Sequence, residues 1–172
     1  MGFTITIGNA IPQVPTQSEI DEGEDRTPRW RVQRGESEDA PSFPGDIEGS
    51  VRRPSYQVWG EFCQATDLSS LFFGAQGQKN ITPRDTCLIL DHPGVTLLAA
   101  SDLVEVRHAL ELWRAKPWPT KNRIAGFDPN ISAFDDQVPD PQYDGHLCRL
   151  LWLEFWIDWA LKNCEFPAIG NT

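Results

Sequence analysis

Apolar and polar residues alternate in two segments near the N-terminus. In the first segment the apolar residues alternate with threonines and are Phe3, Ile5 and Ile7. In the second segment they alternate with arginines and are Trp30 and Val32. A period of two in β-favouring residues predicts half-buried strands over 3–8 and 29–34, the first of which ends at the Gly8-Asn9 pair.

Two short apolar runs farther along the chain, 86–90 and 95–99, are joined by the sequence Asp91-His92-Pro93-Gly94. Proline at the second turn position and glycine at the third suit a type II turn. These residues therefore predict a β-hairpin made of the two runs.

A first helix is predicted after Ser55, whose side chain suits an N-cap. Its buried face follows from residues at three-to-four spacing, which are Tyr56, Trp59, Phe62, Cys63 and Thr66. Gly60 weakens this pattern, and a further helical turn is expected over 68–73.

A second helix is predicted from Ser101, its N-cap, to Lys116. Acidic residues lie in its first turns and basic residues in its last turn, which is the charge order that the helix dipole favours. Pro117 then ends it. The apolar side consists of Leu103, Val106, Ala109, Leu110 and Trp113.

The third predicted helix runs from about Pro141 to Cys164. Three tryptophans at i, i+4 and i+7 form one ridge, Trp152, Trp156 and Trp159, with Phe155 on its flank. Only a narrow stripe is polar, and it consists of Glu154, Asp158 and Lys162.

A helix that is apolar over so much of its circumference is enclosed by its own domain, enters a bilayer, or meets another chain. The central run of about 15 residues rises roughly 22 Å, which is short of the roughly 30 Å that a membrane span requires. A central core helix and a partner-binding or dimer face therefore remain as the two interpretations of the tryptophan ridge.

Together these elements predict an α+β fold, in which a small antiparallel sheet packs against about three helices. The strand order does not follow from the sequence. Residues 1–54 are expected to hold an N-terminal strand and an extended, proline-rich arm, and residues 55–172 a compact α+β domain, as one domain overall. The arm is long, irregular and acidic, with Glu19, Asp21, Glu22, Glu24 and Asp25.

Length and charge narrow the function further. The chain has 172 residues, of which 25 are acidic and 15 basic, so that the net charge is −10. Long-range repulsion disfavours the binding of phosphate backbones and anionic lipid, and we therefore expect no direct nucleic-acid binding and no membrane binding.

The predicted second strand carries three arginines, Arg29, Arg31 and Arg34, which need anionic partners. We expect the carboxylates of the acidic arm to be these partners. The alternative is that the arginines form an anion-binding site.

The cysteines and the N-terminus indicate a reducing compartment. The four cysteines are widely spaced without a C-x-x-C pair, so we expect them to be reduced and buried. The first residues carry no basic segment followed by a long apolar one, and we therefore expect a cytoplasmic protein. The tripeptide Ile-Gly-Asn occurs at 7–9 and again at 169–171, and we interpret this echo as chance.

Three residue groups are weak candidates for chemistry. Glu105 and His108 match a Glu-x-x-His spacing, but one copy does not make a di-metal site, and a solvated helix face is the favoured interpretation. His92 beside Asp91 is the histidine best placed for reactivity. A partial calcium-loop pattern lacks its glycine and its final glutamate, and its weak candidate ligands are Asp128, Asp135 and Asp136.

No nucleophile elbow, phosphate loop or dinucleotide fingerprint is present, and we expect no cofactor. The leading hypothesis is a non-enzymatic interaction or assembly protein that binds a protein partner or a second copy of itself. An acidic inhibitor that mimics nucleic acid toward a basic partner, and a small His-based or metal-dependent enzyme, are the alternatives. The predicted interaction residues are Trp152, Trp156, Trp159, Phe155 and Trp30.

Overall fold

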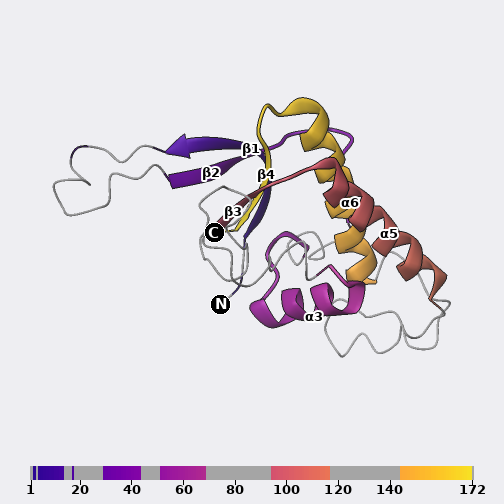
Figure 1. Ribbon diagram of the computed structural model, residues 1–172. Coiled ribbons are helices and arrows are strands. Elements are labelled where there is room, and N and C mark those ends of the chain that lie inside the picture. Colours follow the sequence, from indigo (N-terminus) through magenta and orange to yellow (C-terminus); the bar gives the residue numbers. More distant parts are fainter. Residues whose placement is uncertain are drawn as a thin grey trace.

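The computed structural model describes residues 4–13, 29–43, 51–68, 94–116 and 144–171, together with Gly2 and Gln17. Its helices are α3 (Tyr56–Thr66), α5 (Ala100–Ala115) and α6 (Gly145–Asn163). Its strands are β1 (Ile5–Gln13), β2 (Arg29–Arg34), β3 (Gly94–Leu97) and β4 (Pro167–Asn171). The strands form one antiparallel sheet in the order β2-β1-β4-β3, which confirms the predicted α+β class (Figure 1).

The sheet contains a C-terminal strand that the sequence did not predict. β4 lies between β1 and β3, and the predicted strand over 86–90 falls outside the described residues. Pro167 and Gly170 lower the strand propensity of this segment, and proline is tolerated here because it is the first residue of the strand. The first strand and most of the turn of the predicted hairpin also lie outside the described residues. Its second strand is β3, which pairs with β4.

The repeated Ile-Gly-Asn tripeptide, which we interpreted as chance, has a structural role in the sheet. The two copies pair in antiparallel strands, with Ile7 opposite Ile169. The Asn9 side-chain oxygen accepts a hydrogen bond from the backbone N–H of Phe166 at 2.8 Å. The Asn171 side-chain oxygen accepts one from Gly94 at 2.6 Å, so that each asparagine fastens the start of a neighbouring strand.

β1 continues past the Gly8-Asn9 pair to Gln13, which corrects the predicted end of this strand. Gly8 lies inside the strand because the backbone of β2 approaches it closely. A Cβ at this position would lie 1.9 Å from the Gln33 carbonyl oxygen. This glycine therefore permits close strand pairing and does not end the strand.

The two faces of the sheet are covered differently. One face contributes Ile5, Ile7 and Ile169 to the main core, which also contains much of α6. The other face carries a small separate cluster around Ala10 and Ala168, and the edge strands β2 and β3 contact each other there. Small side chains suit this face because the curled sheet leaves little space within it.

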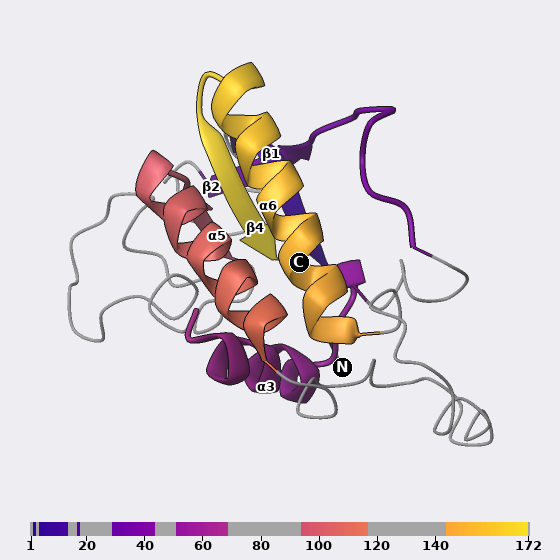
Figure 2. The same ribbon diagram turned by 90° about the vertical axis from the view of Figure 1, so that its right-hand side faces the viewer.

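α6 packs against β1 and β4 of the sheet, α5 lies beside α6, and α3 lies near one end of the two helices, in contact with α5 (Figure 2). The polar stripe of α6 faces α5 at the surface, where Arg107 forms ion pairs with Glu154 at 2.9 Å and with Asp158 at 3.4 Å. Among the helices of the described segments, none combines the length and apolar composition needed to cross a bilayer.

The helix starts differ in part from their predictions. Ser55 caps α3 as predicted, with its side chain accepting from Val58 N. The N-cap of α5 is Ala99, two residues before the predicted Ser101, because the Asp102 carboxylate accepts from the backbone N–H of Ala99 at 2.6 Å and so starts the helix at Ala100. α6 begins at Gly145, not near Pro141, because Asp144 is its N-cap.

Three of the cysteines fall within the described segments. Cys63, Cys148 and Cys164 carry free thiols, as predicted. Cys63 and Cys148 are buried, whereas Cys164 is only half-buried, which differs from the expected burial. Cys87 lies outside the described residues.

Candidate functional site

The structure divides the five predicted interaction residues into two groups. Trp152 and Trp156 are only 5% and 6% exposed, because the chain's own residues cover most of both rings. Phe155 and Trp159 are half-buried, and Trp30 on β2 is 40% exposed. Most of the tryptophan ridge therefore belongs to the core, and only its edges reach the surface.

The aromatic rings of α6 form a continuous edge-to-face row. The Phe155 and Trp156 ring centroids are 5.2 Å apart with an interplanar angle of 90°. Those of Trp156 and Trp159 are 5.6 Å apart at 69°. These are the arrangements that aromatic quadrupoles favour, so the row forms a rigid surface against which other residues can pack.

The segment 35–43 after β2, here called the strap, packs on this row. Gly35 lies directly on the rings, since a Cβ at this position would be 2.5 Å from Trp159 Cζ3 and 2.9 Å from Trp156 Cζ3. Ala40 and Phe43 also pack against the core. The strap is therefore anchored at both ends along the aromatic face.

Between the strap and α6 lies a pocket of about 320 Å³, a volume near the lower end for small-molecule sites. α6 contributes Trp152 and Trp156 to its wall. The charged residues of the lining are Arg34 at the end of β2, Glu36 and Arg52. The remaining lining residues belong to the strap and are Gly35, Ser37, Ala40, Pro41 and Ser42.

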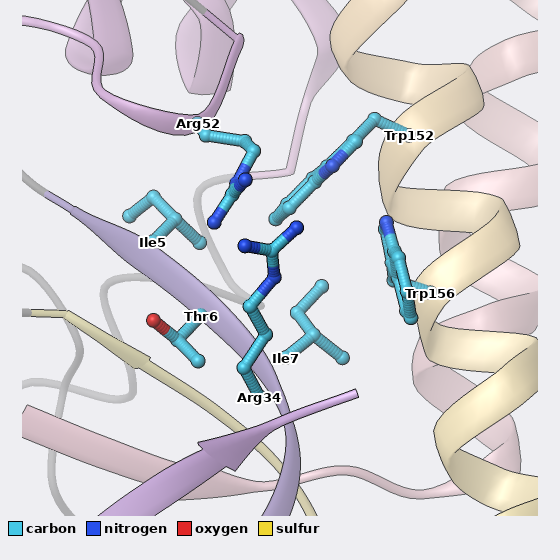
Figure 3. Close-up of a pocket in the computed structure, with 7 residues that line it drawn as sticks. All are labelled: Ile5, Thr6, Ile7, Arg34, Arg52, Trp152 and Trp156. Atoms are coloured by element: carbon cyan, nitrogen blue, oxygen red, sulfur yellow. The ribbon is translucent and has the colours of Figure 1, made fainter. Parts of the chain in front are cut away.

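The two arginine side chains come from different segments and meet at the pocket. Figure 3 shows a smaller neighbouring pocket of about 10 Å³, which the two arginines line together with Ile5 and Ile7 of β1. There the two guanidinium groups point toward each other beside Trp152. Arg34 is exposed and Arg52 is half-buried, so both groups are accessible from solvent.

Among the described residues, the pocket lining carries two arginines and one glutamate. Within the described segments, neither Arg34 nor Glu36 forms an ion pair or a side-chain hydrogen bond. The Arg34 guanidinium therefore keeps its five donors available for an anionic ligand.

Part of this site was predicted from the sequence. Trp152 and Trp156 were expected to be interaction residues, and an anion-binding site was the alternative for the arginines of β2, which include Arg34. The acidic arm, which was the preferred partner for these arginines, lies outside the described residues. Arg52 was missed because it stands in a proline-rich segment without periodicity, and only its proximity to Arg34 gives it a role.

A second polar cluster lies at the start of α6, where Asp144 is fully buried. One carboxylate oxygen accepts from the backbone N–H groups of His146 and Leu147 at 3.1 and 3.0 Å. The other accepts from Trp113 Nε1 on α5 at 2.8 Å. This carboxylate therefore caps α6 and fastens α5 to it.

His146 and Arg149 complete this buried cluster. Burial, together with the positive charges of Arg149 and Lys116, lowers the pKa of His146 to about 4. The His146 ring packs edge-on against Phe62 and Trp113. Burial likewise lowers the pKa of Arg149 to about 10, while its Nη1 donates to the Gly145 carbonyl at 3.0 Å.

The other candidates for chemistry are not brought together. Glu105 and His108 are both exposed on α5, as expected for a solvated face. No group of three or more potential metal ligands occurs in the part of the chain that the structure describes. His92 and Asp91 lie outside the described residues, as do Asp128, Asp135 and Asp136.

Comparison with protein-family models, with curated proteins and with solved structures finds no match to this chain. The function therefore has to follow from the chemistry of the pocket itself, which is a pair of accessible guanidinium groups beside a rigid aromatic wall.

Proposed function

We propose that this protein is a non-enzymatic interaction protein and that its pocket receives an acidic segment of a partner protein. The observation that carries the proposal is the exposed Arg34 guanidinium in a pocket walled by Trp152 and Trp156. A carboxylate of the partner would bind this guanidinium group, and apolar parts of its chain would lie against the ring edges and the strap.

The chemistry of the lining supports binding over catalysis. Guanidinium groups bind carboxylates through two parallel hydrogen bonds but do not exchange protons near neutral pH. The lining of the pocket combines them with indole edges, two serine hydroxyls and one carboxylate. Such a set orients an anion, whereas a general base and an activated nucleophile would be needed for acyl or phosphoryl transfer.

The surroundings of the pocket also resemble the centre of a protein interface. Interface centres are enriched in tryptophan and arginine, which contribute most of the binding energy in pockets that exclude water. Here the rings are held by the core, so their positions are fixed before a partner arrives. A preorganised wall reduces the entropy that binding costs.

The test uses two peptides of equal length, one with consecutive glutamates beside a phenylalanine and one with glutamines in their place. The Trp152 and Trp156 indole N–H signals of the full chain are followed by NMR during titration. We expect the acidic peptide alone to shift both signals, and its binding to weaken as salt is added.

Arg34→Gln is the test variant, and Arg114→Gln on the exposed face of α5 is its matched control. Loss of a charged anchor should weaken binding of the acidic peptide about tenfold or more, and the control should bind like the original chain. Equal binding by both variants, or indole signals that do not respond to the acidic peptide, would overturn the proposal.

A further inference from the structure

Arg34 and Glu36 line the same pocket with opposite charges that do not pair with each other. Both side chains are exposed, and neither forms an ion pair or a side-chain hydrogen bond within the described segments. Arg52, the other cation among the described lining residues, already has an interaction within the chain. The pocket therefore offers the guanidinium group of Arg34 and, two residues further along, the carboxylate of Glu36.

These two charges place different requirements on a ligand. A guanidinium group binds one carboxylate through two parallel hydrogen bonds. A carboxylate accepts hydrogen bonds from N–H donors and repels further carboxylates at short range. A run of glutamates meets the first requirement but brings extra negative charge close to Glu36. A ligand that carries one carboxylate and an adjacent N–H donor meets both requirements.

We infer that the pocket binds the C-terminal residue of the partner, and that this residue has an apolar side chain. This inference rests on the proposed function, because it specifies which carboxylate of the partner the same pocket selects. Only at the C-terminus of a polypeptide are a carboxylate and a backbone N–H attached to the same Cα atom. The terminal carboxylate would accept from Arg34, and the N–H of the same residue would donate to Glu36.

The volume and the walls of the pocket agree with the end of a chain. About 320 Å³ is room for one large residue. An internal segment would have to pass into this volume and out again, whereas a terminal residue only has to enter. Trp152 and Trp156 form one wall, and Ala40 and Pro41 of the strap also belong to the lining. An apolar terminal side chain would bury its surface against these residues.

The experiment compares three peptides of equal length that end in phenylalanine. The first has a free C-terminal carboxylate and no acidic side chain, and the second is its C-terminal amide. The third is an amide with two glutamates before the phenylalanine, so it reports side-chain carboxylates alone. Affinities for the full chain are measured by calorimetry, with the indole N–H signals as the marker of the site. We expect the free-carboxylate peptide to bind about tenfold or more tightly than the glutamate peptide, and the neutral amide not to bind.

Variants of the two charged residues test their separate roles. Arg34→Gln should weaken the free-carboxylate peptide about tenfold, and Arg114→Gln should leave its affinity unchanged. Glu36→Gln should reduce the preference for the free-carboxylate peptide over the glutamate peptide, because glutamine keeps an acceptor oxygen but no longer repels the added carboxylates. Glu38→Gln is the matched control, since Glu38 is exposed on the strap and is not among the described lining residues.

The outcomes separate this inference from the proposed function. If the glutamate peptide binds as tightly as the free-carboxylate peptide or more tightly, this inference is wrong and the acidic-segment proposal stands. Equal binding of the free-carboxylate peptide and its amide would also overturn the inference, because the terminal carboxylate would then contribute nothing. If neither the free-carboxylate peptide nor the glutamate peptide shifts the indole signals, both the inference and the proposed function are wrong.

Discussion

The arginines at the two ends of the α6 aromatic face differ in burial and in hydrogen bonding. Near the start of the helix Arg149 is 1% exposed and donates to the Gly145 carbonyl of its own helix. One and two turns further along, Trp152 and Trp156 face the pocket in which Arg34 is exposed. The first arginine is committed to the fold, and the second is available to a ligand.

The surrounding groups explain this difference. The buried end is closed by the Asp144 carboxylate, whose oxygens are used by Trp113 and by the first turn of α6. At the pocket Arg34 is exposed, and within the described segments its side chain forms no ion pair or hydrogen bond. Substitutions at the buried end should therefore change stability, and those at the pocket should change binding.

The largest effect is expected for Asp144→Ala. This variant removes the N-cap of α6 and leaves the Trp113 indole N–H buried without its acceptor, which should lower the free energy of unfolding by about 4 kcal/mol. Asp144→Asn keeps one acceptor oxygen and should lose about half of that amount. Urea unfolding of the full chain measures both, and equal stability of Asp144→Ala and the original chain would show that the buried end is not held by this carboxylate.

Acid should destabilise the buried end through His146. Its pKa in the folded chain is about 4, below its ordinary value of 6.5, so the unfolded chain binds a proton first as the pH falls. Stability is therefore lost between pH 6.5 and pH 4, on the order of 3 kcal/mol from this group, and that loss does not continue below pH 4. Unfolding free energies at pH 7 and pH 4.5 should differ less in His146→Gln than in the original chain.

His108→Gln is the matched control for this pH dependence, because His108 is exposed on α5. It should retain the full loss of stability between the two pH values. A His146→Gln chain that is as acid-sensitive as the His108→Gln chain would assign the pH dependence to other groups.

The same substitution in the two arginines compares the two ends directly. Arg149→Ala removes a side chain that fills core space and should lower the free energy of unfolding by about 2 kcal/mol. Arg34→Ala removes an exposed side chain and should change it by less than about 0.5 kcal/mol. Thermal unfolding measures the loss of stability in both variants. A larger loss for Arg34→Ala than for Arg149→Ala would mean that the Arg34 side chain stabilises the fold.

A smaller loss of stability than for Arg149→Ala is expected for Gly35→Ala. Its Cβ would lie 2.5 Å from the Trp159 ring, so the strap has to shift away from α6. The cost should be about 1 kcal/mol, with a measurable change in the Trp159 indole signal and in affinity for an acidic peptide. Gly60→Ala on α3 is the control, because a Cβ there meets nothing within 4 Å and should stabilise the helix.

Periodicity predicted the regular elements where local preferences decide them. β2 spans 29–34 as expected, and α3 begins after its Ser55 cap. The end of β1 and the existence of β4 were not predicted, because glycine and proline there depend on partners far away in sequence. Gly8 is accommodated in β1 because the Gln33 backbone of β2 lies close to it, and Pro167 is the pairing partner of Asn9 in β1.

The candidate site divides in the same way. The sequence by itself determined the three-to-four repeat of tryptophans on α6, the excess of negative charge and the arginines of β2, since these follow from composition and from the geometry of one helix or one strand. Only the tertiary structure decided that Trp152 and Trp156 are largely covered, that Arg34 and Arg52 meet, and that Arg149 is buried. Burial and proximity between distant segments depend on how the sheet, the strap and α6 pack, and no local pattern contains that information.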